Sequence, residues 1–387
     1  MEIQQAKEQV VLAGRELVRT GLIARTWGNV SCRIDGSSFV VTPSGRAYET
    51  LTSDEIVLCR TADASYEGEI KPSSERGVHA LVYRMHPHAG FVIHTHQLWA
   101  SAVSACGLTS IPVEGVPLLG DRIPVAAYGL PGTKKLRSGI AQALKENTGN
   151  AVIMAHHGAL CFGRDYEEAF FAAQQLEQAC EAYVRKIFEQ KSGQVFTDIA
   201  SLGAYYLSRA AGAKPPSPIP PACSRRAPGG FALTNNGTLS FRFTDTPLPG
   251  DADVHRAVYE SRKDISFIVQ AAAQGLLELS AAGKTLFPML DDFAQLVGVS
   301  ARTAKSNAPG DVVRALKGRA AVFLPNGGAL CCANTQSDVE AVCMVMEKNT
   351  LAWLCSWLTG GGKPIHPLEC RLMRVVYLKS YSKKANA

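Results

Sequence analysis

Phe91-Val92-Ile93-His94-Thr95-His96 is an apolar run that carries two histidines separated by one residue. The run has the character of a buried strand, and side chains two positions apart on a strand point to the same face. His94 and His96 can therefore reach one point. A third histidine from a distant strand or turn would complete a three-histidine site with an open position, which is the arrangement that a catalytic zinc needs.

The candidates for this third histidine are in His156-His157-Gly158, which follows the apolar run Ala151-Val152-Ile153-Met154-Ala155. Neighbouring side chains at a strand end face opposite ways, so only one of the two histidines can join the site. The local pattern does not choose between them. Three further histidines, His79, His86 and His88, are expected on a helix or at its solvated end.

Glu75 ends the stretch Lys71-Pro72-Ser73-Ser74-Glu75, and a helix is expected from Ser74 to about His86. A glutamate in the first turn of a helix is commonly favoured by the helix dipole alone. Beside a metal, the same carboxylate could move a proton to and from a carbon next to a polarised carbonyl.

Three turns of small residues are candidates for an anion site: Gly28-Asn29, Ser44-Gly45 and Ser73-Ser74. Backbone N–H groups next to glycine, together with serine hydroxyls, are what a phosphate monoester needs. Each of these segments alone is an ordinary turn, so a phosphate site requires that the three meet in space.

Length and composition are those of a globular protein of two domains, with 387 residues, 46% hydrophobic and 19% charged. The net charge of +6 is mild, and basic residues gather only at the tail, so no nucleic-acid or membrane partner is expected. The first residues lack the order of a signal peptide, and no apolar run approaches about 18 residues. The eleven cysteines are irregularly spaced, which favours buried reduced thiols in a cytoplasmic protein.

Periodicity and turn signals predict helices and strands in alternation through the first half of the chain. Strands are expected at residues 29–34, 38–42, 56–59, 91–96 and 151–155, the first two joined by a turn at Asp35-Gly36. Helices are expected at residues 2–20, 74–86, 98–106, 131–144 and 166–190. Thr133 is the expected cap of the fourth helix.

A change in composition marks the expected boundary between the domains. Residues 212–221 are dense in proline, and residues 225–230 are rich in turn-forming types. The prediction is a first domain at residues 1–212, a semi-extended linker at 213–229 and a second domain at 230–387.

The second domain repeats the first in three collinear blocks, which indicates a tandem duplication. Val78-His79 and Val82-Tyr83 recur as Val254-His255 and Val258-Tyr259, an offset of 176 residues. Gly28, Ser31 and Arg33 are matched with Gly237, Ser240 and Arg242, and residues 158–161 with 328–331. In this register, Gln270, Ala272, Gly327 and Asp251 stand opposite His94, His96, His157 and Glu75. The second copy would thus keep the core without the metal ligands, as a structural or interface domain.

Six motifs of the first domain look like those of the class II aldolase/adducin family, in the family's order. They are TWGNVS at 26–31, TPSG at 42–45, KPSSE at 71–75, HTH at 94–96, the segment 124–133 with Tyr128, and HHG at 156–158. The chain resembles this family over residues 1 to about 190, and within it the L-fuculose-phosphate aldolase branch.

The resemblance implies an α/β fold, with α/β/α layers around a largely antiparallel sheet, here in two tandem copies. It implies zinc-dependent cleavage of a ketose 1-phosphate to dihydroxyacetone phosphate and an aldehyde. His94, His96 and His157 would bind one zinc ion per chain, and Glu75 would be the general acid/base. The phosphate of the substrate would be held by Gly28, Asn29, Ser44, Gly45, Ser73 and Ser74. Tyr128 matches a family tyrosine that protonates or positions the aldehyde oxygen, or is a packing tyrosine in a proline-rich loop.

Other members of the family leave alternatives open. A 4-epimerase of pentulose 5-phosphates and a decarboxylase use related chemistry, and the adducins resemble the fold as non-enzymatic scaffolds. The loop at 129–133 resembles the aldolases more than the epimerases. The family's cyclic tetramer of single domains implies that this two-domain chain forms a homo-oligomer, either a dimer that imitates the tetramer or a larger one. The second copy has no tyrosine at the place of Tyr128, which lies near Ser306.

Overall fold

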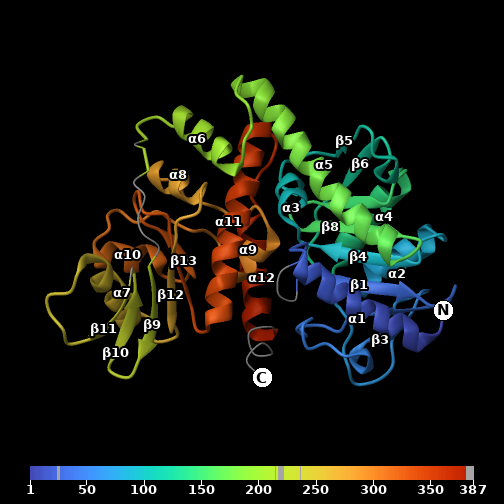
Figure 1. Ribbon diagram of the computed structural model, residues 1–387, viewed down its shortest axis with the longest axis horizontal. Helices are drawn as coiled ribbons and strands as arrows, with labels where there is room; N and C mark the ends of the chain where they lie inside the picture. The colour runs from blue at the N-terminus through green and yellow to red at the C-terminus, as the bar shows by residue number, and fades with distance from the viewer. Residues whose placement is uncertain (24–26, 214, 217–221, 236, 381–387) are drawn as a thin grey trace. The chain divides into compact units, whose positions relative to one another are not determined.

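The computed structural model describes residues 1–23, 27–213, 215–216, 222–235 and 237–380. The chain divides into two compact units (Figure 1). The first is built mainly from Met1–Ile187, and the second from Phe188–Leu358 with Lys363–Lys379. Each unit has its own sheet and its own hydrophobic core.

The first unit contains an eight-stranded sheet in the order β3-β2-β1-β4-β8-β7-β6-β5. Its strands are β1 (Asn29–Arg33), β2 (Ser38–Val41), β3 (Val57–Arg60), β4 (Phe91–Thr95), β5 (Ser110–Pro112), β6 (Arg122–Ala126), β7 (Ala151–Met154) and β8 (Gly158–Gly163). All neighbours are antiparallel except β6 and β7, which confirms the predicted sheet. All five residues of the central strand β4 are buried, as its continuous apolar run requires.

Helices cover both faces of this sheet: α1 (Ile3–Arg19), α2 (Arg76–Met85), α3 (Leu98–Ser104), α4 (Lys134–Glu146) and α5 (Tyr166–Ser192), with short 3-10 turns at Ser53–Glu55 and Pro117–Leu119. Helices α2 and α4 pack with Val92 of β4 into one core. Phe91, which alternates with Val92, contacts Tyr166 of α5 on the opposite face. The side chain of Thr133 accepts a hydrogen bond from Leu136 N and caps α4 as predicted.

The second unit contains a six-stranded sheet in the order β11-β10-β9-β12-β14-β13. Its strands are β9 (Cys223–Ala227), β10 (Gly230–Thr234), β11 (Thr238–Arg242), β12 (Phe267–Ala271), β13 (Ala321–Phe323) and β14 (Ala329–Ala333). Its helices are α6 (Ile199–Arg209), α7 (Gly250–Ser261), α8 (Leu276–Ala281), α9 (Asp291–Leu296), α10 (Pro309–Leu316), α11 (Gln336–Thr359) and α12 (Pro367–Ser380). β12 pairs with β9 and β14 just as β4 pairs with β1 and β8, so the two sheets follow the same path.

A buried serine–histidine–tyrosine network joins a strand to a helix in each unit. Its members are Ser31, His79 and Tyr83 in the first unit and Ser224, His255 and Tyr259 in the second. In both units the serine Oγ lies 2.6 Å from the histidine Nδ1. Ser224 of β9 is therefore the counterpart of Ser31, and the predicted match with Ser240 of β11 is wrong.

Two arginines support the corrected alignment. Arg33 donates to the carbonyl oxygen of Tyr83, and Arg226 donates to the carbonyl oxygen of Tyr259. Arg226, two residues after the serine, thus takes the place of Arg33, and Arg242 does not.

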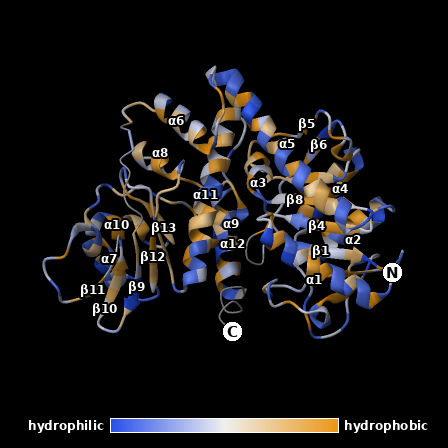
Figure 2. Cartoon of the chain, in the orientation of Figure 1, coloured by the Kyte–Doolittle hydropathy of each residue, from blue (hydrophilic) through white to orange (hydrophobic). Residues whose placement is uncertain are grey.

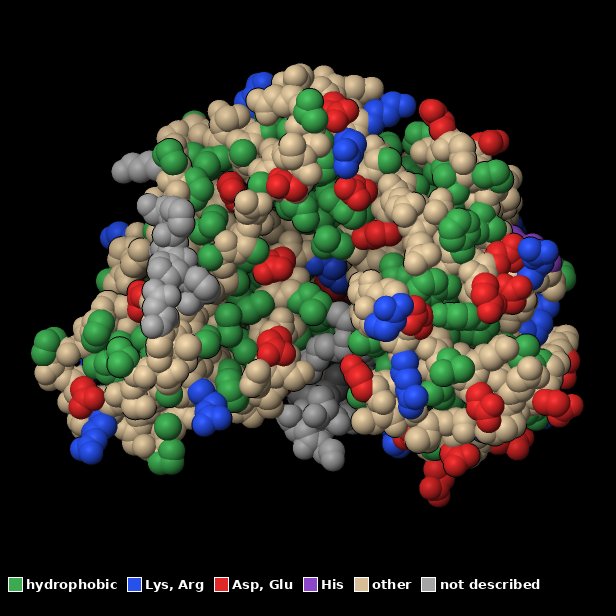
Figure 3. All heavy atoms as spheres, viewed as in Figure 1, with side chains coloured by type: hydrophobic (Ala, Val, Ile, Leu, Met, Phe, Trp, Pro, Cys, Tyr) green, Lys and Arg blue, Asp and Glu red, His purple; other side chains and the backbone are tan. Residues whose placement is uncertain are grey.

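On the face of the molecule that Figure 3 shows, lysine and arginine side chains are interspersed with acidic side chains.

The path of the chain into the second unit differs from the prediction. Strand β9 occupies residues 223–227, which lie inside the predicted linker at 213–229, so the second sheet begins before residue 230. Residues 214 and 217–221 of that segment lie outside the described residues. The units also divide after Ile187 rather than after residue 212, because α6 packs against α8 of the second unit.

Figure 2 shows both hydrophobic and hydrophilic residues along the helices. In α1 the buried positions include Ala6, Val10, Ala13 and Leu17, at helical spacing. Among the described residues, no helix has both the length and the apolar character that crossing a membrane requires. All eleven cysteines are free thiols.

The buried His255 makes the stability of the second unit sensitive to acid. Its side chain is 1% exposed, and burial lowers its pKa to about 4, whereas an unfolded histidine has a pKa of about 6.5. As the pH falls from about 6.5 to about 4, the His255 imidazole takes up a proton in the unfolded chain but stays neutral in the folded chain. The free energy of unfolding should then fall by on the order of 3 kcal/mol from this group.

We expect His255→Gln to weaken this pH dependence, because glutamine does not titrate. Urea unfolding of the wild-type protein and of the variant between pH 7 and pH 4 measures the effect. Parallel pH profiles for the two proteins would contradict the assignment.

Candidate active site

Three histidines converge at one end of the first sheet. His94 lies near the end of β4, His96 follows that strand, and His157 lies in the turn between β7 and β8. One ring nitrogen from each of them lies within 4.8 Å of the others, and Nε2 of His94 is 3.0 Å from Nε2 of His96. The convergence follows from the sheet, since β4 and β8 are adjacent antiparallel strands.

The backbone orients two of these imidazoles. Nδ1 of His94 lies 2.8 Å from the carbonyl oxygen of Ala159; because a carbonyl can only accept, Nδ1 carries the proton and Nε2 keeps its lone pair. His156 adopts a left-handed conformation with φ of 61°, and its ring contacts Tyr128. His157 instead stacks its ring 5.0 Å from that of His94. The structure thus brings His157 to the cluster and turns His156 away from it.

The Glu75 carboxylate lies against this cluster, at the start of α2. Its Oε1 is 2.9 Å from Nε2 of His157, and its Oε2 is 3.2 Å from Nε2 of His94. Asn29 donates to Oε2 through Nδ2 at 2.9 Å. Burial raises the pKa of Glu75, which is 8% exposed, whereas positive charge on His94 and His157, when these rings are protonated, and the hydrogen bonds from His157 and Asn29 lower it.

This donor set fits a zinc ion. Three neutral imidazoles with one open position form a catalytic zinc site, and structural support for a ligating histidine commonly comes from a backbone carbonyl. His94 has that support from Ala159. The carboxylate of Glu75 stands where it can reach a group bound at the open position.

The turns predicted to hold phosphate meet beside Glu75. Ser44 N donates to the carbonyl oxygen of Lys71, and Ser73 N donates to that of Thr42, each at 2.9 Å. These bonds place the segments 42–45 and 71–74 side by side. The Tyr48 hydroxyl donates to the carbonyl oxygen of Gly28 at 3.0 Å. Thr42 N donates to the carbonyl oxygen of Val30 at 3.0 Å, which brings the strand that follows Gly28 beside the segment 42–45.

Two predicted residues take up contacts that the sequence did not suggest. The side-chain amide of Asn29 is occupied on both sides, by Glu75 through Nδ2 and by His79 through Oδ1. The Asn29 side chain therefore binds the Glu75 carboxylate, although Asn29 was predicted as part of a phosphate site. Tyr128 is half-buried and packs its ring on His156 within the first unit, one residue away from the metal cluster.

His79 was expected on a helix or at its solvated end, and it lies within α2. Its contact with the predicted site was not foreseen: it is fully buried and contacts Asn29 directly. The pair Val78-His79 and Val82-Tyr83 recurs in the second half of the chain, and this repetition was the signal that could have found it.

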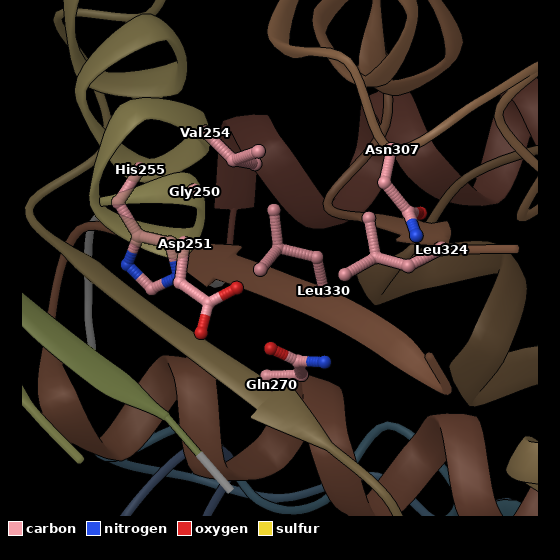
Figure 4. A pocket seen from close by; sticks show the side chains of 8 residues that line it. All are labelled: Gly250, Asp251, Val254, His255, Gln270, Asn307, Leu324 and Leu330. Atoms are coloured by element: carbon pink, nitrogen blue, oxygen red, sulfur yellow. The ribbon is translucent and has the colours of Figure 1, made fainter. Parts of the chain in front are cut away.

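The second unit has a cavity where the first has the histidine cluster. The cavity measures about 160 Å³ and is lined by Gly250, Asp251, Val254, His255, Gln270, Asn307, Leu324 and Leu330 (Figure 4). Gln270 pairs with Leu330 as His94 pairs with Leu160, so it stands in the position of His94. Gln270 donates to the carbonyl oxygen of Gly327 at 2.9 Å, the residue in the place of His157.

Residues 8–184 match the class II aldolase and adducin N-terminal domain family. Several solved structures are similar to the chain. An L-fuculose 1-phosphate aldolase is 26% identical, with a TM-score of 0.45, and the match covers 51% of this chain and 92% of that one. The L-fuculose-1-phosphate aldolase of Thermus thermophilus is 28% identical, with a TM-score of 0.42 and coverage of 49% and 98%. A sugar-phosphate aldolase of Thermotoga maritima is 21% identical, with a TM-score of 0.41 and coverage of 50% and 98%.

Gly28 is required by the close approach of β1 to β4. Its φ is 108°, and a Cβ atom at this position would lie 2.6 Å from the carbonyl oxygen of His94. Gly45 has a φ of 73° but open space around it, which makes it a matched control.

We expect Gly45→Ala to cost about 1 kcal/mol of stability, from backbone strain alone. Gly28→Ala should cost on the order of 3 kcal/mol or more, because strain and a backbone clash add. Urea unfolding of both variants checks this difference. Equal losses would show that the approach to His94 tolerates a methyl group.

Proposed function

Because residues 8–184 match the class II aldolase and adducin N-terminal domain family, we propose that the first unit is a zinc-dependent aldolase. It would cleave a ketose 1-phosphate to dihydroxyacetone phosphate and an aldehyde. The observation that carries the proposal is the buried Glu75 carboxylate in contact with His94 and His157. A carboxylate held against imidazoles that converge on one point suits proton transfer at a carbon next to a polarised carbonyl.

His94, His96 and His157 would hold the metal ion. When bound, zinc supplies the positive charge that stabilises negative charge as it develops on the substrate oxygens. An ionised Glu75 carboxylate can accept a proton.

Glu75 would act as the general acid/base at carbon. In the cleavage direction, the C4 hydroxyl would pass its proton, through Tyr128 or solvent, to the Glu75 carboxylate as the C3–C4 bond breaks, and Glu75 would then deliver that proton to C3 of the three-carbon product. In the synthesis direction, Glu75 removes that proton and C3 attacks the aldehyde. Tyr128 would serve the aldehyde oxygen, since its ring packs beside the metal-site turn on His156.

The joined turns would hold the phosphate group of the substrate. Ser44, Gly45, Ser73 and Ser74 would contribute backbone N–H groups and hydroxyls from segments that lie side by side. Gly28 and Asn29 would contribute through their backbone, because the Asn29 side chain contacts Glu75 and His79. A phosphate at this place would hold the three-carbon end of the substrate beside Glu75.

We propose that the second unit is a duplicated copy that has lost this chemistry. The shared strand path and the repeated serine–histidine–tyrosine network support a common origin. Gln270 and Gly327 stand where His94 and His157 ligate in the first unit, and neither supplies an imidazole. Two chains would then assemble into a ring of four such units with two active sites.

Metal content tests the ligand assignment. Protein stripped of metal and reloaded should hold about one zinc ion per chain, because one unit carries three imidazoles and the other carries none of them. His157→Ala should abolish tight binding. His156→Ala should retain it, since that ring faces Tyr128. Two zinc ions per chain, or equal losses in the two variants, would contradict the assignment.

Proton exchange tests the role of Glu75. Zinc-loaded wild-type protein in D₂O should exchange a C3 hydrogen of dihydroxyacetone phosphate, as followed by NMR. Glu75→Gln should abolish this exchange while zinc stays bound, because glutamine cannot accept the proton.

Asp251→Asn is the matched control from the second unit and should exchange at the wild-type rate. Unchanged exchange in Glu75→Gln would remove Glu75 from the mechanism.

A panel of aldehydes, offered with dihydroxyacetone phosphate, would identify the second substrate by product formation. Exchange without product for every aldehyde would argue against an aldolase.

A further inference from the structure

We propose that His79 is a positioning residue for Glu75. It fixes the orientation of the Asn29 side-chain amide, and this amide in turn holds the carboxylate. The inference rests on the proposed role of Glu75 in proton transfer. It adds to that role a buried relay of hydrogen bonds that reaches from the carboxylate back into the core of the first unit.

The relay is continuous. The Tyr83 hydroxyl lies 2.7 Å from Ser31 Oγ, and Ser31 Oγ lies 2.6 Å from Nδ1 of His79. Nε2 of His79 contacts Oδ1 of Asn29, and Nδ2 of Asn29 lies 2.9 Å from Oε2 of Glu75. All five side chains are buried, so water does not compete for these bonds.

The carboxylate dictates the direction of every bond in the relay. An ionised carboxylate can only accept, so Asn29 must present its Nδ2 donor to Glu75 and its Oδ1 acceptor to His79. His79 must therefore carry its proton on Nε2 and accept at Nδ1. Ser31 then donates to Nδ1 and accepts from Tyr83, and each group has one permitted role.

His79 is suited to hold this orientation. Burial, followed by the nearby His94, lowers the pKa of His79 to about 3, so the ring stays neutral and keeps one donor and one acceptor. If its Nε2–H were removed, Oδ1 of Asn29 would lose its donor and the amide could turn over. Oδ1 would then face the carboxylate of Glu75, and like partial charges would push the two groups apart.

The second unit shows the same network without the amide that links it to a carboxylate in the first unit. Ser224, His255 and Tyr259 repeat the serine–histidine–tyrosine part. Ala222 occupies the place of Asn29, since Ala222 O accepts from the backbone of Gln270, the residue at the position of His94. His255 borders the cavity of about 160 Å³ instead of an amide (Figure 4). The network therefore has a structural role of its own, and only the first unit extends it to a reactive group.

This duplication supplies a matched pair of variants, His79→Ala and His255→Ala. Both remove a buried histidine bonded to serine, so both should lower the urea midpoint. Only His79→Ala should lower kcat for exchange on dihydroxyacetone phosphate, by about ten- to a hundred-fold, which is the usual effect of removing a supporting partner. Its KM and its zinc content should stay within about two-fold of wild type, because the phosphate turns and the metal ligands are untouched.

His79→Gln is the conservative variant, because its amide can still donate to Oδ1 of Asn29. It should recover most of the lost rate without recovering the imidazole. A rate loss shared equally by His79→Ala and His255→Ala would show a purely structural role and overturn the proposal. An unchanged kcat in His79→Ala would overturn it as well.

A spectroscopic measurement on the wild-type chain separates this inference from the proposed activity. Nitrogen-15 NMR of histidine-labelled, zinc-loaded protein should show His79 as the Nε2–H tautomer, unchanged from pH 8 to pH 5. An Nδ1–H tautomer would reverse the relay and overturn the inference. If His79 shows the Nε2–H tautomer but the protein does not exchange hydrogen on dihydroxyacetone phosphate, the hydrogen-bond relay is supported and only the proposed activity is contradicted.

Discussion

A carboxylate buried in a protein core is costly unless opposite charge and hydrogen bonds compensate it, and the first unit is organised around that constraint at Glu75. The compensation comes from separate elements: Asn29 from β1, His94 from β4 and His157 from the β7–β8 turn. The register of the sheet brings them together, because Asn29 is paired directly with His94 across β1 and β4. The close packing at Gly28 and the serine turns follows from the same alignment of strands.

The second unit lacks the groups that compensate the buried carboxylate in the first unit. Its counterpart of Glu75 is Asp251, which has a shorter side chain and is exposed to solvent. A buried carboxylate beside Gln270 would have no imidazole to compensate it, which is consistent with the exposure of Asp251 to solvent. The buried Ser224, His255 and Tyr259 remain, because they join strand to helix and do not depend on a metal.

The sequence could reveal those parts of the site that have a local pattern. The spacing of His94 and His96 placed both on one strand face, and the apolar run before His157 placed it at a strand end. It could not separate His157 from His156, since a left-handed turn residue decides that choice. It also misplaced the counterpart of Ser31, because Ser224-Arg225-Arg226 and Ser240-Phe241-Arg242 both repeat its serine–x–arginine pattern. Only the hydrogen bonds to a distant helix distinguish the two strands.

The turn that carries His157 is set by the scaffold. His156 and Asn326 both have positive φ values, 61° and 62°, although only the first precedes a histidine. A Cβ atom on the following Gly158 would lie 2.2 Å from the carbonyl oxygen of Thr95, and one on Gly328 would lie 2.3 Å from that of Ala271. Close packing of the turn on the central strand therefore fixes its shape in both units. The residue at its tip can therefore differ without loss of the fold, and it is His157 in one unit and Gly327 in the other.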